Sequence, residues 1–291
     1  MKAGVIGLGA MGAHMALNFD RAGVLAAVWN RTPARAQALE FSGGVLRAGT
    51  PAEAAAKSDL IVTCVSRDAD VFEVARAMLP GLSAGKIVCD TSTVSRDTAC
   101  ELSALYKTRR ADFLDCPVSG GVEGARKAAL AMMVGGDAAV FGRARPLLSK
   151  IAANVVHMGP TGSGQATKAV NQIMAAGINQ AVTEALAFGE AMGLDMNKVI
   201  DVVGSGAAGN WFLSHRGKTM VAGSYAPGFK VALHHKDLEI IQRMARDRSR
   251  WPLSVVANTL ADYEQLMHEG HGDEDISALY RLKKENFKPG T

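Results

Sequence analysis

A lysine and an asparagine three residues apart, Lys168 and Asn171, carry side chains well placed for acid–base chemistry and substrate binding in this 291-residue chain. From residue 165 to residue 192 there is no proline and glycine occurs only singly, which predicts one helix about 42 Å long. Positions three apart share a helix face, so the ammonium and the amide point into the same space. A single lysine near a helix start is more often a solvated charge, and this stretch alone leaves both interpretations open.

The first residues of the chain form a turn suited to a phosphate group. An apolar run at residues 3–6 leads into a glycine-rich turn, and a helical pattern follows. The turn has the pattern G-x-G-x-x-G and consists of Gly7, Leu8, Gly9, Ala10, Met11 and Gly12. In such a turn Gly7 permits the sharp bend, Gly9 lets the backbone approach a pyrophosphate, and Gly12 allows close packing of helix on strand. Because the positive end of the helix dipole favours phosphate, this context predicts a dinucleotide coenzyme.

The residues after the second predicted strand, 25–29, indicate which coenzyme is bound. About 20 residues past the glycines, NAD-selective sites carry an acidic residue that accepts from the ribose 2′-hydroxyl. This chain has Asn30 there, followed by Arg31 and Thr32. Asn30 does not repel a 2′-phosphate, and the Arg31 guanidinium offers it several donors. The pattern predicts NADP in preference to NAD; the alternative is that Arg31 is a solvated turn residue.

Short apolar runs alternate with helical segments through the first half, which predicts a mainly parallel, doubly wound sheet of the Rossmann type. The further strand-like runs lie at residues 45–47, 60–65, 87–90, 113–115, 132–134 and 155–157. The helical patterns lie at residues 33–41, 51–57, 68–78, 94–108 and 137–149. In this architecture ligands bind beyond the carboxyl ends of the strands.

Three loops at such strand ends are candidates for ligand binding. Val65 and Ser66 are expected to line the coenzyme site, and Thr93 follows the next strand. The stretch Ser119-Gly120-Gly121 places a hydroxyl and several backbone donors together, which suits the carboxylate of a small substrate. Each loop alone is more often a turn or a helix cap. Together they converge on one crevice.

After residue 192 the strand pattern stops and only helical patterns follow. These lie at residues 196–206, 212–221, 234–247, 252–268 and 275–284. The expected architecture is α/β: a coenzyme-binding domain at residues 1–162 and an all-α domain at residues 163–291, joined by the long helix. Aromatic residues of the second domain, Trp211, Phe212 and Phe229, could form an apolar wall of the substrate site, but residues of this type are more often part of the core.

The long helix has small or apolar residues on nearly every side, which favours burial against a second subunit. We therefore expect a homodimer or a homotetramer. The face that continues from Lys168 and Asn171 is expected to be a packing seam formed by Ala175, Ile178, Val182, Ala185 and Gly189.

Composition excludes several classes of function. The net charge is +4 with a pI of about 8.9, yet the basic residues form no run and aromatic residues are only 5% of the chain, so no nucleic-acid surface is expected. No apolar stretch approaches the ~20 residues of a membrane span, and no targeting segment is apparent. We expect a cytoplasmic protein without a membrane partner.

The cysteine and histidine patterns do not predict a metal site. Cys64, Cys89, Cys100 and Cys116 lack the C-x-x-C spacing and mostly follow apolar residues, which favours reduced thiols in the core. The pair at residues 234–235 consists of adjacent histidines, whose side chains point apart on a helix.

With these motifs in order, the chain resembles the β-hydroxyacid dehydrogenases, which include 3-hydroxyisobutyrate dehydrogenase, tartronate semialdehyde reductase and the glyoxylate/succinic semialdehyde reductases. The resemblance spans nearly the whole chain. Its four motifs are the glycine turn at 7–12, Asp115-Cys116-Pro117-Val118-Ser119-Gly120-Gly121, Gly162-Ser163-Gly164 with Lys168 and Asn171, and Lys236-Asp237-Leu238.

The resemblance implies a role for each motif. Lys168 would be the catalytic residue, while Ser119, Gly120 and Asn171 would orient the substrate. Thr93 and Lys236 would border the nicotinamide. The implied reaction is hydride transfer between the coenzyme and a carbonyl carbon, with a lysine ammonium donating the proton to the forming alkoxide during reduction.

Two departures from the family pattern refine this expectation. Lys127-Ala128-Ala129-Leu130 has alanines where the family usually has Gly-Thr, and Asn30-Arg31-Thr32 is similar to the NADP-using semialdehyde reductases. An imine reductase on the same architecture is one alternative, although those enzymes usually have another proton donor in place of Lys168. A catalytically silent NADPH-binding scaffold is the other; such members lack the lysine.

Overall fold

A computed structural model describes residues 1–246 and 249–287 and divides the chain into two compact units, Met1–Lys168 and Ala169–Thr291. The boundary expected from the sequence, between residues 162 and 163, falls six residues before this division, because the first turn of a long helix belongs to the first unit. Each unit is described by itself.

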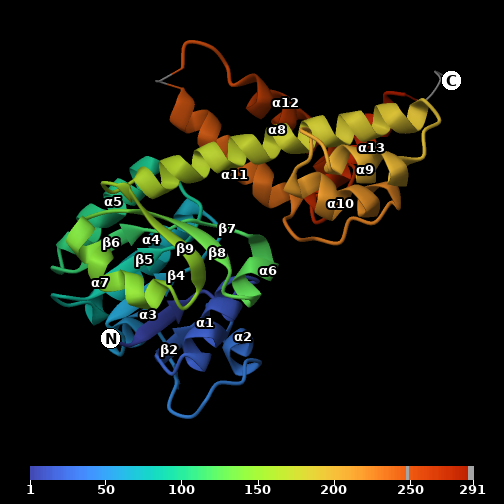
Figure 1. The fold of residues 1–291 in the computed structure, drawn as a ribbon. Coiled ribbons are helices and arrows are strands. Elements are labelled where there is room, and N and C mark those ends of the chain that lie inside the picture. Colours follow the sequence, from blue (N-terminus) through green and yellow to red (C-terminus); the bar gives the residue numbers. More distant parts are fainter. Residues whose placement is uncertain (247–248, 288–291) are drawn as a thin grey trace. The chain divides into compact units, whose positions relative to one another are not determined.

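The first unit contains one sheet (Figure 1). Its strands are β1 (Ala3–Ile6), β2 (Leu25–Trp29), β3 (Leu46–Arg47), β4 (Leu60–Thr63), β5 (Ile87–Asp90), β6 (Asp112–Asp115), β7 (Val118–Ser119), β8 (Leu130–Gly135) and β9 (Ala152–Gly159). The order across the sheet is β3-β2-β1-β4-β5-β6-β8-β7, and β9 also pairs with β8. Strands β1 to β6 pair in parallel, whereas β8 runs antiparallel to β6 and β7. The prediction of a mainly parallel sheet is confirmed.

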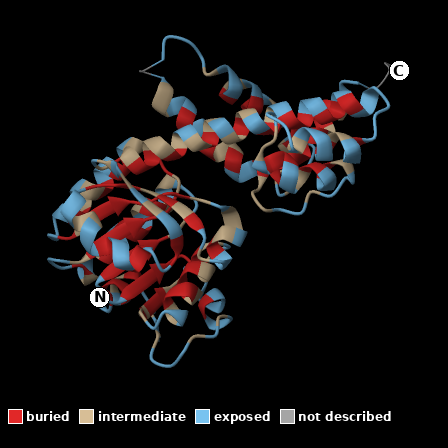
Figure 2. Ribbon diagram, in the orientation of Figure 1, coloured by how far each residue is buried: buried red, intermediate tan, exposed pale blue. Residues whose placement is uncertain are grey.

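Helices cover both faces of this sheet. They are α1 (Gly12–Arg21), α2 (Pro33–Gln37), α3 (Pro51–Ala56), α4 (Asp68–Met78), η1 (Leu79–Gly81), α5 (Arg96–Lys107), α6 (Gly121–Arg126) and α7 (Ala138–Leu148). Successive residues of a strand point to opposite faces, so Val5 and Val62 join one apolar cluster while Ile6 and Ile61 join another. Central strands are therefore buried on both sides, as Figure 2 shows, which explains their continuous apolar runs.

Several elements differ from their predicted bounds, and for one helix and one strand the structure shows the cause. The helix expected at residues 33–41 ends at Gln37, because the Arg47 guanidinium donates to the carbonyl oxygens of Ala36 at 3.1 Å and Leu39 at 2.8 Å. These carbonyls are thus bound by a distant side chain. Strand β9 covers residues 152–159 rather than 155–157, because its pairing with β8 extends beyond the apolar run.

The long helix α8 (Ser163–Ala191) confirms the helix expected at residues 165–192. The expected packing seam is only partly correct: Val182 is buried, but Ile178 and Ala185 are exposed. The buried side of the helix instead includes Ala176, Asn179, Thr183, Leu186 and Ala187. Two polar residues lie on it because Thr183 donates to a helix carbonyl and Asn179 donates to Tyr263 and to the Ile276 carbonyl.

The second unit is helical throughout its described residues. After α8 come α9 (Met196–Gly204), α10 (Trp211–Val221), α11 (Val231–Ala245), α12 (Ser254–His268), η2 (Ile276–Ala278) and α13 (Leu279–Glu285). The prediction of an all-α second half is confirmed for these residues. The helix expected at residues 234–247 begins three residues earlier, and residue 247 lies outside the described residues, as do residues 288–291 of the expected domain.

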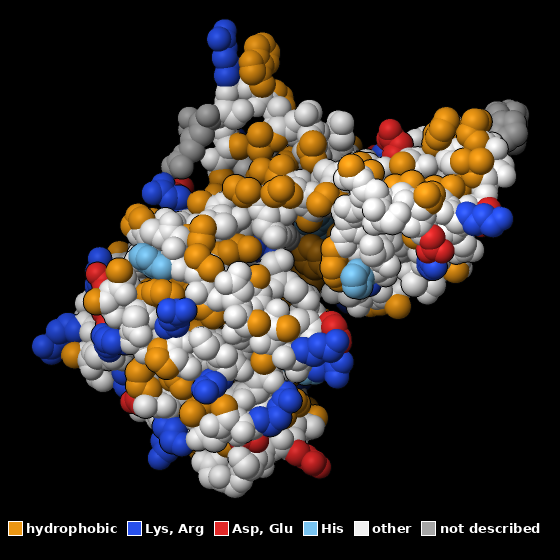
Figure 3. Space-filling view, in the orientation of Figure 1, with side chains coloured by type: hydrophobic (Ala, Val, Ile, Leu, Met, Phe, Trp, Pro, Cys, Tyr) orange, Lys and Arg blue, Asp and Glu red, His pale blue; other side chains and the backbone are white. Residues whose placement is uncertain are grey.

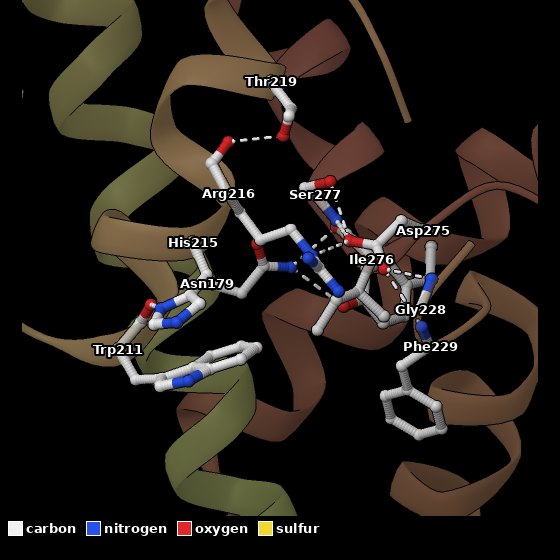
Figure 4. Close-up of polar contacts among 11 residues, drawn as sticks. Asn179, Trp211, His215, Arg216, Thr219, Gly228, Phe229, Asp275, Ile276 and Ser277 are labelled. Atoms are coloured by element: carbon white, nitrogen blue, oxygen red, sulfur yellow. Dashed lines mark hydrogen bonds and ion pairs between the residues drawn. The ribbon is translucent and has the colours of Figure 1, made fainter. Parts of the chain in front are cut away.

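A buried carboxylate organises part of the second unit (Figure 4). Asp275 is 1% exposed and accepts hydrogen bonds from the backbone N–H groups of Gly228 and Phe229 at 2.9 and 3.0 Å. The Arg216 guanidinium of α10 lies 3.2 Å from the same carboxylate. This charge pairing ties α10 to the segment before α11 and to η2. Nearby, Trp211 is exposed and stacks on His215, so it does not contribute to the core, whereas Phe212 is buried.

The four cysteines are free thiols, as expected, but they do not all lie in the core. Cys89 and Cys116 are buried, Cys64 is half-buried and Cys100 is exposed on α5. Cys100 departs from the prediction because the helix turns its position towards solvent. None of the helices in the described part of the chain is both long enough and apolar enough to cross a bilayer.

Candidate active site

The carboxyl ends of the parallel strands border a cleft of about 250 Å³ in the first unit. It is lined by Gly7, Gly9, Trp29, Asn30, Arg31, Thr32, Arg35, Cys64, Val65, Ser66, Asp70, Glu73 and Val74. These residues come from the end of β2, from the loops after β1, β2 and β4, and from α2 and α4. Of the three loops expected to converge on one crevice, only the loop with Val65 and Ser66 lines this cleft; Thr93 and Ser119-Gly120-Gly121 are not among its lining residues.

The glycine turn has little space at two positions and open space at a third. Gly7 has φ of 95°, and a Cβ there would lie 2.2 Å from the Cys64 carbonyl oxygen. A Cβ on Gly12 would lie 1.9 Å from the Gly7 carbonyl oxygen. By contrast, a Cβ on Gly9 would have only the Arg35 guanidinium near it, at 3.9 Å. Gly7 and Gly12 therefore let the protein fold, while Gly9 faces the space that a pyrophosphate would fill.

Replacing Gly9 with alanine is therefore expected to leave the fold intact and to weaken coenzyme binding. The added methyl meets no backbone atom of the protein, but it would displace a phosphate from the turn. We expect the Kd for NADPH to rise about tenfold or more, the equivalent of one hydrogen bond to a charged group. Fluorescence titration measures this Kd, and a thermal melt shows whether the fold of the variant is intact. Gly12→Ala is the matched variant, in which the melting temperature should fall; unchanged coenzyme binding by Gly9→Ala would contradict the assignment.

The turn is braced from the end of β2. The Leu8 backbone N–H donates to the Asn30 side-chain oxygen at 2.8 Å, and the Asn30 amide donates to the Thr32 carbonyl at 2.9 Å. Asn30 was predicted to accommodate a 2′-phosphate by its lack of charge; its amide in fact holds the turn in place. Among the described residues no side chain caps the start of α1, although the Ala13 N–H donates to the Gly9 carbonyl at 3.1 Å. The positive end of the helix dipole favours an anion here.

Two arginines line the cleft. Arg31 follows β2 as predicted, and Arg35, which was not predicted to be a site residue, lies in the first turn of α2. The opposite wall carries two carboxylates of α4, Asp70 and Glu73. The Arg31 guanidinium lies 2.9 Å from the Asp70 carboxylate and 3.7 Å from that of Glu73. Positive and negative groups therefore meet across the cleft.

A buried hydrogen-bond network joins the coenzyme cleft to the loop after β5. The Val65 N–H donates to the Ser92 hydroxyl at 3.0 Å, and this hydroxyl donates to Asp90 at 2.8 Å. Asp90 also accepts from Thr63 at 2.6 Å. The other carboxylate oxygen of Asp90 is buried and has no hydrogen-bond partner among the described residues. Burial raises the pKa of Asp90 to about 6, against the opposing hydrogen bonds from Thr63 and Ser92.

The same loop is joined to the start of α8 by Gln165. Its amide donates to the Ser92 carbonyl at 2.8 Å and accepts from the Val94 N–H at 3.3 Å. Thr93, predicted to border the nicotinamide, lies half-buried between these two anchored residues. Ser66, also predicted to line the cleft, is exposed at its rim.

A second carboxylate, at the end of β6, caps the helix that carries the lysine. Asp115 is fully buried and accepts from the N–H groups of Gly162 at 2.8 Å and Gln165 at 2.9 Å. Burial raises the pKa of Asp115, and the backbone hydrogen bonds oppose this shift. Lys168, one turn further, is 7% exposed. The solvated-charge interpretation of Lys168 is therefore wrong. Its helical turn is held at the edge of the sheet where the glycine turn lies.

The predicted substrate loop has the backbone that its glycines imply. Ser119 ends β7 and is half-buried, and Gly120 and Gly121 have φ of 127° and 61°. The loop after α6 shows the family departure: Ala128 has φ of 55°, a left-handed conformation that glycine adopts at less cost.

The remaining predicted residues belong to the second unit and are linked to each other. Asn171 donates to the Gln172 side chain at 2.8 Å, and Gln172 donates to Asp237 at 2.7 Å. Asp237 lies 3.0 Å from the Lys236 ammonium and is 4% exposed. A chain of polar contacts thus joins Asn171 to Lys236. His234 is buried and contacts the Tyr263 hydroxyl, and the described residues contain no cluster with the composition of a metal site.

Several residues of this site were not identified from the sequence. They are Arg35, Asp70, Glu73, Gln165 and Gln172. Arg35 follows Arg31 by only four residues, in the first turn of α2, and this short separation is a signal that could have placed both near the end of β2. The contacts of Gln165 had no signal in the sequence, because its partners lie more than 70 residues away.

Comparison with known proteins accounts for nearly the whole chain. Residues 2–159 match the NAD-binding domain of 6-phosphogluconate dehydrogenase, and residues 162–283 match the NAD-binding domain of NADP-dependent 3-hydroxyisobutyrate dehydrogenase. An uncharacterised oxidoreductase of Shewanella frigidimarina is 40% identical over 97% of this chain and 98% of its own. The 2-hydroxy-3-oxopropionate reductase of Escherichia coli is 36% identical over 84% of this chain and 85% of its own.

Solved structures agree with this assignment. The 3-hydroxyisobutyrate dehydrogenase of Mycobacterium tuberculosis, determined with L-serine, is 30% identical and covers 97% of this chain and 98% of its own with a TM-score of 0.85. An imine reductase from Pseudomonas sp. is 21% identical with a TM-score of 0.65, a likeness of fold alone. The glycine turn, the strand-end cleft and these matches together place the chain in the β-hydroxyacid dehydrogenase family, as an oxidoreductase that binds a nicotinamide coenzyme.

Proposed function

We propose that the chain is an NADP-dependent reductase of small semialdehydes, which interconverts them with the corresponding hydroxyacids. Glyoxylate, succinic semialdehyde and tartronate semialdehyde are the proposed substrates. The observation that carries the proposal is the burial of Lys168 on a helical turn that Asp115 and Gln165 hold at the strand-end edge of the sheet. A buried ammonium at that edge suits a proton donor.

Each predicted residue has a place in this chemistry. When bound, the coenzyme supplies the hydride that reduces the carbonyl carbon. Lys168 donates the proton to the carbonyl oxygen, and the Ser119 loop with its two glycines binds the substrate carboxylate. Asn171 and Lys236, joined through Gln172 and Asp237, orient substrate and nicotinamide.

An assay of NADPH consumption tests the substrate class. Turnover with one or more of glyoxylate, succinic semialdehyde and tartronate semialdehyde, without turnover of a cyclic imine such as 1-pyrroline, would support the proposal. Turnover of the imine alone would identify an imine reductase. Binding of NADPH without turnover of any compound in the panel would favour the scaffold alternative.

The proposed coenzyme preference rests on Arg31 and Arg35, which both line the cleft beside Thr32. Replacing either arginine with alanine removes charged donors for the 2′-phosphate. We expect the KM for NADPH to rise by about one to two orders of magnitude, with the KM for NADH nearly unchanged. Steady-state kinetics with both coenzymes provide the measurement. A wild-type KM for NADH equal to or below that for NADPH would contradict the preference.

We also propose that the chain forms a homodimer or homotetramer through α8. Val170, Met174, Ile178 and Phe188 of this helix are 57%, 62%, 38% and 52% exposed, and Figure 3 shows hydrophobic side chains along it. An apolar stripe on one long helix suits a second copy of itself, because a twofold axis pairs the same residues.

Replacing Met174 with glutamate should therefore shift the chain towards monomer in sedimentation at micromolar concentration, since two carboxylates would be buried at the interface. Lys198→Glu on α9, at a side chain 86% exposed, is the charge-changing control. A monomeric wild-type chain would exclude the proposed assembly.

A further inference from the structure

The coenzyme cleft contains carboxylates that an NADP site does not require. Asp70 and Glu73 project from α4 into the wall opposite Arg31 and Arg35. The charged residues of the cleft lining are these four, so its formal charge is zero. An anion such as a 2′-phosphate therefore meets a site in which half of the charges repel it.

The two arginines have different surroundings. Arg31 is held by Asp70 at 2.9 Å and by Glu73 at 3.7 Å. Arg35 forms no ion pair within residues 1–246 and 249–287, and its guanidinium lies near the glycine turn. A phosphate can bind Arg35 directly, but it must share or displace the carboxylates to bind Arg31.

The ion pair is weak enough to be displaced by a ligand. The Arg31 and Glu73 side chains are 68% and 65% exposed, and that of Asp70 is 24% exposed. Exposed pairs contribute little to stability and exchange readily with solvent ions. Asp70 also lies in the first turn of α4, where the helix dipole favours a negative charge whether or not Arg31 is bound.

We propose that Asp70 and Glu73 limit the coenzyme preference of this enzyme by competing with the 2′-phosphate of NADP for Arg31. NADPH then binds less tightly than the two arginines alone would allow, and NADH, which has no 2′-phosphate, is unaffected. Asp70 and Glu73 therefore reduce the difference in binding affinity between NADPH and NADH. This inference rests on the proposed function in taking Arg31 and Arg35 as the phosphate-binding residues.

The test measures the Kd of NADPH and NADH by fluorescence titration for Asp70→Asn, Glu73→Gln and the double variant, at low and at physiological salt. We expect each single change to lower the Kd for NADPH about threefold and the double change about tenfold, as for exposed ion pairs. The Kd for NADH should stay within about twofold of wild type. The gain in NADPH affinity over wild type should be smaller at higher salt, because salt already screens the carboxylates of wild type.

Two controls separate competition from other effects. Glu101→Gln, at an exposed residue of α5 away from the cleft, removes the same charge and should leave both Kd values unchanged. In an Arg31→Ala background, Asp70→Asn should no longer improve NADPH binding. If Asp70→Asn improved NADPH affinity equally in that background, the carboxylate would act by direct repulsion of the phosphate and not by competition for Arg31. That result would overturn the proposal. Glu73→Gln keeps the test valid if Asp70→Asn lowers the melting temperature.

The outcome is distinguishable from failure of the proposed coenzyme preference. Suppose that wild type prefers NADH but the double variant gains affinity for NADPH alone. The proposed preference for NADP is then wrong, whereas the proposed competition for Arg31 is supported. If wild type prefers NADPH and the double variant has an unchanged or higher Kd for NADPH, the proposed competition for Arg31 is wrong, whereas the proposed preference for NADP is supported. Equal changes for both coenzymes also overturn the competition.

Discussion

Replacing Lys168 with alanine is expected to lower kcat by about two to four orders of magnitude while leaving the Kd for NADPH within a few-fold of wild type. The change removes the group that is proposed to donate a proton to the carbonyl oxygen. It leaves the glycine turn, Arg31 and Arg35 in place, and these residues line the coenzyme cleft. Single-turnover kinetics with a semialdehyde and fluorescence titration of NADPH measure the two quantities separately.

The burial of Lys168 makes a second substitution necessary, because alanine leaves a cavity beside α8. Lys168→Met keeps most of the side-chain volume and should show the same loss of kcat with a smaller effect on the melting temperature. Lys150→Ala, at an exposed lysine after α7, is the control and should retain full activity. Turnover by Lys168→Met close to that of wild type would remove Lys168 from the catalytic role.

Replacing Asp90 with asparagine is expected to change how the free energy of unfolding depends on pH. Burial raises the pKa of Asp90 from its ordinary 3.8 to about 6. When the pKa of a carboxyl group is higher in the folded than in the unfolded state, the group stabilises the fold fully at a pH below its unfolded-state pKa. This contribution to the free energy of unfolding is lost as the pH rises through the folded-state pKa. Between about pH 4 and pH 6, wild type should therefore lose up to about 3 kcal/mol relative to Asp90→Asn.

Urea denaturation of both proteins at pH 4, 5, 6 and 7 measures this difference. Asp115 also has a raised pKa and is present in both proteins, but its charge helps to raise the pKa of Asp90, so its contribution cancels only in part. Asp97→Asn, in the first turn of α5, is a control for the loss of an aspartate outside the network and should parallel wild type. A constant difference between wild type and Asp90→Asn across this pH range would show that Asp90 does not titrate there.

Much of the fold could be predicted because it depends on local patterns. Apolar runs of four residues became the central strands, and the helix expected at residues 68–78 is α4 with the same bounds. Helix α8 was recognisable because 29 residues without proline have no local reason to stop. The helix after β2 was predicted too long, because the side chain that binds its carbonyls, Arg47, lies beyond it in the chain.

The sequence by itself determined the coenzyme class and the residues that could do chemistry: the glycine turn, Arg31, the Ser119 loop and Lys168. These signals are local, since glycine is favoured where φ is positive and is required where another backbone comes close, as at Gly7 and Gly12. Only the tertiary structure decided that Lys168 is buried, that Asp115 and Gln165 hold its helical turn, and that Asp70 and Glu73 meet Arg31. These contacts join residues 39 to 73 positions apart. Their distances and charges depend on how the strands are ordered in the sheet, which no local pattern of residues specifies.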